Sequence, residues 1–87
     1  MDDIVAFGTR LGHNMALIRR QKRLSQEKFA DLIGLTRQQV SNYERGAVQE
    51  PSHFVVRRLA EIAGLPIEQL TDRTLREEDI KSDVEIK

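Results

Sequence analysis

The sequence predicts an all-α domain built from five short helices. Apolar residues recur at helical spacings of three and four, and residues that cap or end helices separate the periodic segments. No segment shows the apolar–polar alternation of a strand. The 87 residues fit one small domain, which we place at residues 1–70. Residues 71–87 form a highly charged C-terminal tail, which we expect to be either a dimerisation segment or disordered.

The first helix is expected from about Asp3 to Gln21. Its apolar residues follow spacings of 3, 4, 4 and 3, the period of one helix face. Gly8 and Gly12 weaken the prediction for its first turns, because glycine costs roughly 1 kcal/mol in a helix interior. The residues on the apolar face are Ile4, Phe7, Leu11, Met15 and Ile18.

Two short helices follow, joined by a turn that contains glycine. Ser25 is placed to cap the first of them, and Gly34 is placed to end it. Thr36 and Gln39 fit the capping-box pattern S/T-x-x-E/Q, so the next helix is predicted over residues 36–45. The apolar residues expected in the wedge between the two helices are Phe29, Ala30, Ile33, Leu35, Val40 and Tyr43.

A fourth and a fifth helix complete the predicted domain. The fourth is expected from Pro51 and Ser52 to about Ala63, and the short fifth helix over residues 67–70. The residues of the fourth helix that we expect to face inward are Val56, Leu59, Ala60 and Ala63. A further apolar set has no obvious place in the core, and we assign it to a surface between two copies of the chain. These residues are Leu65, Ile67, Leu70, Leu75 and Ile80. The alternative is that Leu70 closes the core of the monomer and the tail is disordered.

The zero net charge counts against an indiscriminate, strongly basic nucleic-acid binder. The net charge is zero, but residues 1–70 hold ten basic and eight acidic residues, whereas residues 71–87 hold four and six. The chain has no cysteine, and His13 and His53 have no partner at metal-binding spacing, so we predict neither a metal nor a cofactor. No apolar run approaches the roughly 20 residues of a membrane span.

Two stretches carry the pattern of a known family. These are IRRQKRLSQEKFADLIGLTRQQVSNYERG and PSHFVVRRLAEIAGLPIEQL. With the residues around them, from Leu11 to Leu70, they resemble the lambda-repressor/Cro-like (Xre-type) helix-turn-helix transcription regulators. The resemblance implies a five-helix DNA-binding domain in which helices two and three form the helix-turn-helix. The sequence departs from the pattern at residues 47–50, which lack a basic residue, and at His53, which replaces an apolar residue and is expected to be half-buried.

The residues expected to read DNA lie on the third helix. If Val40 and Tyr43 face inward, the other side of this helix is polar, and arginine can bridge guanine O6 and N7 while glutamine or asparagine bridges adenine N6 and N7. The resemblance implies that the first positions of this helix, and the position of Asn42, contact bases. We therefore assign base contact to Arg37, Gln38 and Asn42, with Ser41 secondary. The alternative is an ordinary solvated helix face.

Residues around this face are expected to contact the DNA backbone. In related domains the residue at the position of Gln26 bonds a phosphate, and a helix N-terminus is itself an anion site. The expected backbone contacts are Gln26, Thr36, Gln39, Arg45 and Arg23. The alternatives are an exposed first-turn residue for Gln26, a capping role for Thr36 and Gln39, and a solubilising charge for Arg23. The resemblance also implies that Arg19 and Glu44 form a partly buried pair that fixes the angle of the third helix. The alternative is two surface charges, which would contribute little.

The expected function is sequence-specific DNA binding that controls transcription, by repression. We expect the protein to bind double-stranded operator DNA with inverted repeats, as a homodimer in the cytoplasm, on the nucleoid. Two alternatives keep the same domain: an antitoxin whose tail binds a toxin protein, and a restriction–modification controller. A third is a protein-interaction module without DNA binding. The chain has no Gly-rich phosphate loop, no GK[ST] and no Gly-x-Ser-x-Gly motif, so we do not expect an enzyme.

Overall fold

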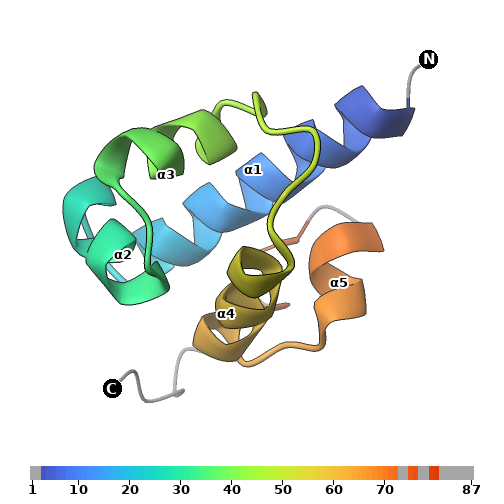
Figure 1. Ribbon diagram of the computed structural model, residues 1–87. Coiled ribbons are helices and arrows are strands. Elements are labelled where there is room, and N and C mark those ends of the chain that lie inside the picture. Colours follow the sequence, from blue (N-terminus) through green and yellow to red (C-terminus); the bar gives the residue numbers. More distant parts are fainter. Residues whose placement is uncertain (1–2, 73–74, 77–78, 81–87) are drawn as a thin grey trace.

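Helices make up most of the described structure, a computed structural model that describes residues 3–72, 75–76 and 79–80 (Figure 1). Within those ranges there is no strand, which confirms the predicted all-α class. The helices are α1 (Asp3–Gln21), α2 (Gln26–Ile33), α3 (Arg37–Glu44), α4 (His53–Ala63) and α5 (Ile67–Asp72). The five predicted helices are therefore all present, and α5 extends two residues beyond its predicted end.

The long helix α1 is the centre of the arrangement. It packs against α3 on one side and against α4 and α5 on the other, while α2 packs on α3 and α4 (Figure 1). The described part of the chain measures 37 × 26 × 19 Å. Because α3 rests on α1 and α2, its orientation depends on the contacts that these two helices make with it.

The ends of α2 and α3 are fixed by local hydrogen bonds, as the sequence predicted. The Ser25 hydroxyl accepts from the Lys28 amide at 3.1 Å, and Gly34 ends α2 with a φ of 85°. At the start of α3, the Gln39 amide donates to the Thr36 hydroxyl at 3.1 Å, and the Thr36 amide donates to the Gln39 side chain at 2.9 Å. These bonds join residues close in the sequence, at the start of α2 and on both sides of the turn between the two helices.

The core draws on all five helices and on the segment that follows them. Of the apolar face predicted for α1, the residues at 11, 15 and 18 are buried, while the side chains at 4 and 7 lie outside the described residues. Helix α4 buries more than the predicted stripe, because Val55 and Ile62 are buried as well. The largest fully buried apolar side chains are Leu11, Met15, Ile18, Phe29, Val40, Leu59, Leu70 and Leu75.

The C-terminal apolar residues belong to this core, which corrects the surface expected from the sequence. Leu70, Leu75 and Ile80 are only 0%, 2% and 5% exposed, and Leu65 and Ile67 are partly buried against the same core. The expectation that these residues lack a place in the monomer is therefore wrong. The sequence pattern was misleading because Leu75 and Ile80 stand in a highly charged segment, although they pack against helices distant along the chain.

A buried asparagine ties this segment to α1. Asn14 is fully buried, its side-chain amide donates to the carbonyl of Leu70 at 2.9 Å, and its oxygen accepts from the amide of Leu75 at 2.8 Å. These bonds satisfy two backbone groups that would otherwise lack partners in the interior. Asn14 thus holds the chain in place on both sides of the point where α5 ends.

Two glycines let α1 approach the end of α3 closely. A Cβ at Gly12 would lie 2.1 Å from the carbonyl oxygen of Tyr43, and one at Gly8 would lie 2.9 Å from the carbonyl oxygen of Val48. Only residues without a side chain fit at these distances. The glycines that weakened the prediction of α1 therefore allow its contacts with the end of α3, at Gly12, and with the loop after α3, at Gly8.

His53 differs from its expectation, because its side chain is exposed rather than half-buried. It is the first residue of α4, after the N-cap Ser52. The inward positions of this first turn are taken by Val55 and Val56 instead. A polar residue is therefore accommodated at 53 without a partner in the core.

Candidate nucleic-acid interface

Helices α2 and α3 form a compact pair joined by residues 34–36. The amides of Gly34 and Leu35 both donate to the carbonyl of Ala30 at 2.9 Å, which closes the end of α2. Ala30 is 2% exposed and lies where a small side chain lets the helices come together. This is the geometry of a helix-turn-helix, in which the second helix is presented on the surface.

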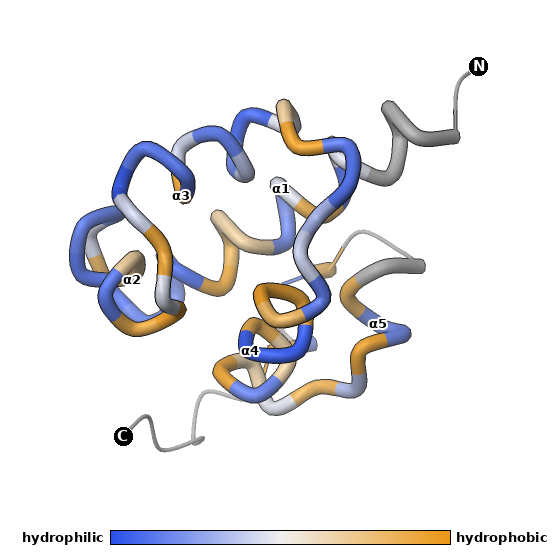
Figure 2. Tube along the Cα trace, in the orientation of Figure 1, coloured by the Kyte–Doolittle hydropathy of each residue, from blue (hydrophilic) through white to orange (hydrophobic). Residues whose placement is uncertain are grey.

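Helix α3 has one apolar and one polar side. Val40 and Tyr43 are 0% and 7% exposed and pack into the core. Figure 2 shows α3 coloured as hydrophilic along most of its length. The residues that carry exposed or half-buried polar side chains on it are Arg37, Gln38, Gln39, Ser41, Asn42 and the C-cap residue Arg45. All of the base-contacting residues expected from the sequence are thus on one accessible helix.

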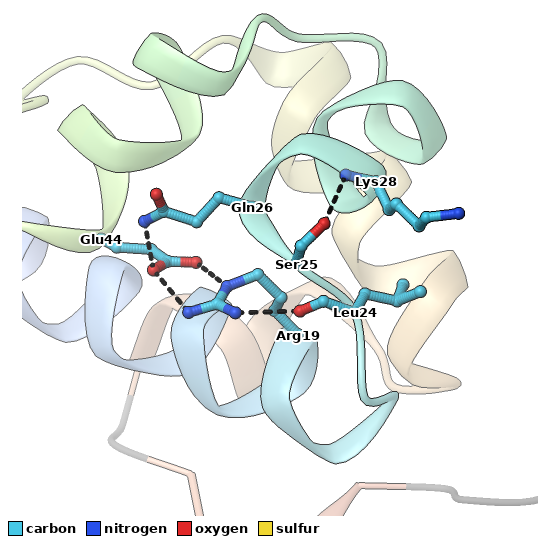
Figure 3. A network of polar contacts seen from close by, with 6 residues as sticks. All are labelled: Arg19, Leu24, Ser25, Gln26, Lys28 and Glu44. Carbon is cyan, nitrogen blue, oxygen red and sulfur yellow. Dashed lines mark hydrogen bonds and ion pairs between the residues drawn. The ribbon is translucent and has the colours of Figure 1, made fainter.

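The end of α3 is held by an ion pair with α1 (Figure 3). The guanidinium of Arg19 donates through Nε to Oε2 of Glu44 at 2.7 Å and through Nη2 to Oε1 at 3.1 Å. The two side chains are 14% and 8% exposed, so water screens the pair little. Arg19 also donates through Nη1 to the carbonyl of Leu24 at 2.9 Å, which links α3 to the turn before α2.

Gln26, the first residue of α2, joins the same network. Its Nε2 donates to Oε1 of Glu44 at 3.1 Å (Figure 3). An amide nitrogen carries two hydrogens, so the second remains to donate to a phosphate. Glu44 is therefore contacted from α1 and from α2, and the start of α2 is fixed relative to the end of α3.

The capping residues of α3 also keep donors for a ligand. Thr36 uses its hydroxyl oxygen as an acceptor and Gln39 uses its carbonyl oxygen as an acceptor, so the hydroxyl hydrogen and the amide hydrogens are not used by the capping box. Arg23 lies in the turn after α1, exposed and with a φ of 59°. Thr36 and Gln39 thus stand at the start of α3, and Arg23 lies in the turn that leads to α2.

Helix α3 and its C-cap carry two exposed cationic side chains, although the net charge of the chain is zero. The carboxylate of Glu44 is paired with Arg19, so its charge is compensated within the fold. Arg37 and Arg45 stand at the two ends of α3 and are exposed. A local positive potential attracts a polyanion even where the whole-chain balance is neutral.

Comparison with known proteins agrees with this geometry. The family described as Helix-turn-helix matches residues 15–70 of the 87, more than half of the chain. The chain belongs to the Cro/C1-type helix-turn-helix family. No curated protein and no solved structure matches the chain. As a member of this family, it has a lambda-repressor-like fold, and its family-level function is that of a DNA-binding transcriptional regulator.

Other features of this helix-turn-helix protein bear on rival functions. The family is one of DNA-binding domains rather than enzymes. A hollow of about 450 Å³ lies beside α2, and the residues that line it include no histidine or serine. They are Lys22, Leu24, Lys28, Asp31 and Leu32. None of the helices described here is long and apolar enough to span a bilayer.

Two contacts that position the helix-turn-helix were not found from the sequence. The hydroxyl of Tyr43 accepts from the amide of Ser52 at 3.1 Å, which connects α3 to the N-cap of α4. The Nε of Arg58 donates to the carbonyl of Leu32 at 3.3 Å, which connects α4 to the last turn of α2. Periodicity marks Tyr43 as a core residue but gives no sign of the hydroxyl's partner.

The pair between Arg19 and Glu44 gives a testable prediction about stability. Glu44→Ala should lower the free energy of unfolding by about 3 kcal/mol, because the guanidinium then stays mostly buried without its carboxylate. The double variant Arg19→Leu with Glu44→Ala should be less destabilised than Glu44→Ala alone. Urea unfolding of the wild type, both single variants and the double variant gives the coupling. Additive losses would show that the pair contributes no coupling energy.

Proposed function

We propose that this protein is a sequence-specific transcriptional repressor that binds an operator as a homodimer and acts by steric occlusion of the promoter. The supporting observation is the two-sided character of α3. Its apolar residues Val40 and Tyr43 anchor it in the core, while its polar side is accessible and lies between Arg37 and Arg45. A helix presented in this way fits the major groove.

The contacts proposed for α3 follow from the chemistry of its side chains. Arg37 and Gln38, exposed in its first turn, provide a forked guanidinium and an amide for base edges, with Ser41 secondary. Asn42 lies on the same side. Phosphate contacts are proposed for the side chains around this surface, together with the N-terminus of α2. They are Gln26, Thr36, Gln39, Arg45 and Arg23.

Homodimer binding is proposed because a single copy has few cationic contacts for a duplex. Two copies on one DNA would combine their contacts through a high effective concentration. The operator would then be an inverted repeat with half-sites about one helical turn apart. Sedimentation of the protein with and without a 30-base-pair duplex (about three turns) tests this arrangement, and one-to-one binding to an asymmetric site would contradict it.

The alternatives differ in what they require of the rest of the chain. An antitoxin would need its tail to bind a toxin, but Leu75 and Ile80 direct their side chains into the chain's own core. A restriction–modification controller would share the DNA-binding surface and differ in its target promoter. An interaction module without DNA binding would have no use for the positive polar side of α3. A gel shift on the protein's own promoter separates this last alternative from the proposal.

Base readout by Gln38 gives the second prediction. Gln38→Ala should weaken binding to the preferred site by about 1–3 kcal/mol and change binding to random DNA much less. The preferred site comes from selection of genomic fragments with the purified protein, and fluorescence anisotropy measures both affinities. Gln69→Ala, a glutamine on α5, is the control and should leave both unchanged. Equal losses on the two DNAs would make Gln38 a backbone contact.

A further inference from the structure

The polar side chains of α3 are joined to one another through Asn42. Its carbonyl oxygen Oδ1 accepts from Nε2 of Gln38 at 3.2 Å and also from Nη2 of Arg45. Gln38 precedes Asn42 by four residues and Arg45 follows it by three, so the three residues share one helix face. One side-chain oxygen therefore binds the two long, exposed side chains on either side of it.

This arrangement changes what Asn42 can offer to DNA. A carbonyl oxygen has two lone pairs, and both are used by these two hydrogen bonds. To bridge an adenine, an asparagine must accept from N6 through this oxygen while it donates to N7. Asn42 would have to give up Gln38 or Arg45 to do so.

Gln38 and Arg45 keep their DNA-directed groups in the same arrangement. The bond to Asn42 uses one of the two Nε2 hydrogens of Gln38 and leaves Oε1 available as an acceptor. Gln38 can therefore still bridge adenine N6 and N7. Arg45 spends one Nη2 hydrogen and keeps further donors for a phosphate. The hydrogen bonds are thus compatible with base readout by Gln38 and with a phosphate contact by Arg45, and they conflict with adenine readout by Asn42.

We infer that Asn42 is a positioning residue, which orients Gln38 and Arg45 for the DNA and does not bridge an adenine of its own. The inference rests on the proposed function of α3. Long exposed side chains lose rotamer freedom when they bind, and this loss opposes binding. Bonds that hold Gln38 and Arg45 in the free protein reduce the loss that remains to be overcome on DNA.

The test compares losses of affinity in two backgrounds. Asn42→Ala in the full chain should weaken binding to the selected site about fivefold to tenfold, where tenfold corresponds to about 1.4 kcal/mol. In a chain that already carries Gln38→Ala, Asn42→Ala should weaken binding by about a further twofold at most. The Gln38 side chain that Asn42 orients is then absent, and only the effect through Arg45 remains. Combined with Arg37→Ala, the full loss caused by Asn42→Ala should remain, because no hydrogen bond joins Arg37 to Asn42. Circular dichroism verifies that each variant is folded.

Base preferences give a readout that loss of stability cannot imitate. Asn42→Ala should relax the selected sequence at the same base pair as Gln38→Ala. Two outcomes would overturn the positioning role while leaving DNA binding in place. In the first, Asn42→Ala relaxes the preference at a base pair that Gln38→Ala leaves intact. In the second, the losses of affinity caused by Gln38→Ala and Asn42→Ala multiply fully in the double variant. A wild-type protein with no preference among DNA fragments would instead reject the proposed function, and this inference with it.

A measurement without DNA completes the test. Nuclear magnetic relaxation of the Gln38 side-chain amide should show a lower order parameter in Asn42→Ala than in the wild type. Asn42→Asp keeps an acceptor oxygen at the same place and should retain the wild-type order parameter. An amide equally mobile in all three proteins would overturn the inference.

Discussion

A chain that carries Gly12→Ala is expected to lose about 3 kcal/mol of stability. The new Cβ would lie 2.1 Å from the carbonyl oxygen of Tyr43 and 3.2 Å from that of Glu44, so the backbone of α1 or the end of α3 must move. Overpacking costs about 1–3 kcal/mol where side chains can shift. Here the neighbour is backbone, so we expect the upper end of this range, even after alanine recovers roughly 1 kcal/mol of helix propensity.

Chemical denaturation of matched variants measures this effect. His13→Ala changes the exposed neighbour of Gly12 on the same helix and should stay within about 0.5 kcal/mol of the wild type. Gly8→Ala, with a Cβ 2.9 Å from the carbonyl oxygen of Val48, should fall between the two. Gly12→Ala should also weaken DNA binding, because the end of α3 moves with the contact. If Gly12→Ala unfolded at the same denaturant concentration as the wild type, α1 and α3 would separate easily.

A chain that ends at Asp72 is expected to be largely unfolded. It lacks Leu75 and Ile80, whose burial stabilises by about 1.5–3 kcal/mol for each side chain. It also leaves the side-chain oxygen of Asn14 without the amide of Leu75. The combined loss of about 3–6 kcal/mol is comparable with the whole stability of many small domains. The melting temperature should therefore fall by at least about 12 °C, since each kcal/mol shifts it by about 4–8 °C.

Thermal denaturation followed by circular dichroism tests this expectation. A chain that ends at Ile80 keeps every contact described here and is the control, and it should melt well above the Asp72 chain. Leu75→Ala in the full chain should reproduce part of the loss. If the Asp72 chain melted like the control, the last apolar residues would add nothing to the core. The tail as a separate dimerisation or disordered segment would then again be a sound interpretation.

The features predicted from the sequence are those that neighbouring residues determine. Ser25 and Thr36 cap helices through amides three residues away, and Gly34 ends α2 through its own backbone conformation. The same holds for the accessible side of α3, because Val40 and Tyr43 fix which way the helix faces. The pattern and chemistry of neighbouring residues were enough to predict these helix ends and the accessible side of α3.

The missed features join residues that are far apart in the sequence. Asn14 meets the backbone 56 and 61 positions later, and no local pattern marks an asparagine as buried. Gly12 appears locally as a weak point in a helix, and only the approach of Tyr43 shows why a side chain is excluded. The links between Gln38, Asn42 and Arg45 are local, but three polar residues on one face do not reveal which of them hydrogen-bond to one another.

The bonds of Asn14 to the C-terminal segment mean that the core is completed late in the synthesis of this protein. Ribosomes synthesise the chain from its N-terminus, so α1, α2 and α3 emerge before Leu75 and Ile80, which complete the core. A nascent or prematurely released chain then contains the whole recognition helix without the packing that holds α1 and its neighbours rigid. Incomplete chains would compete poorly for an operator, and they would expose apolar surface that cellular proteases recognise. The occupancy of DNA would thus depend on chains that extend through Ile80.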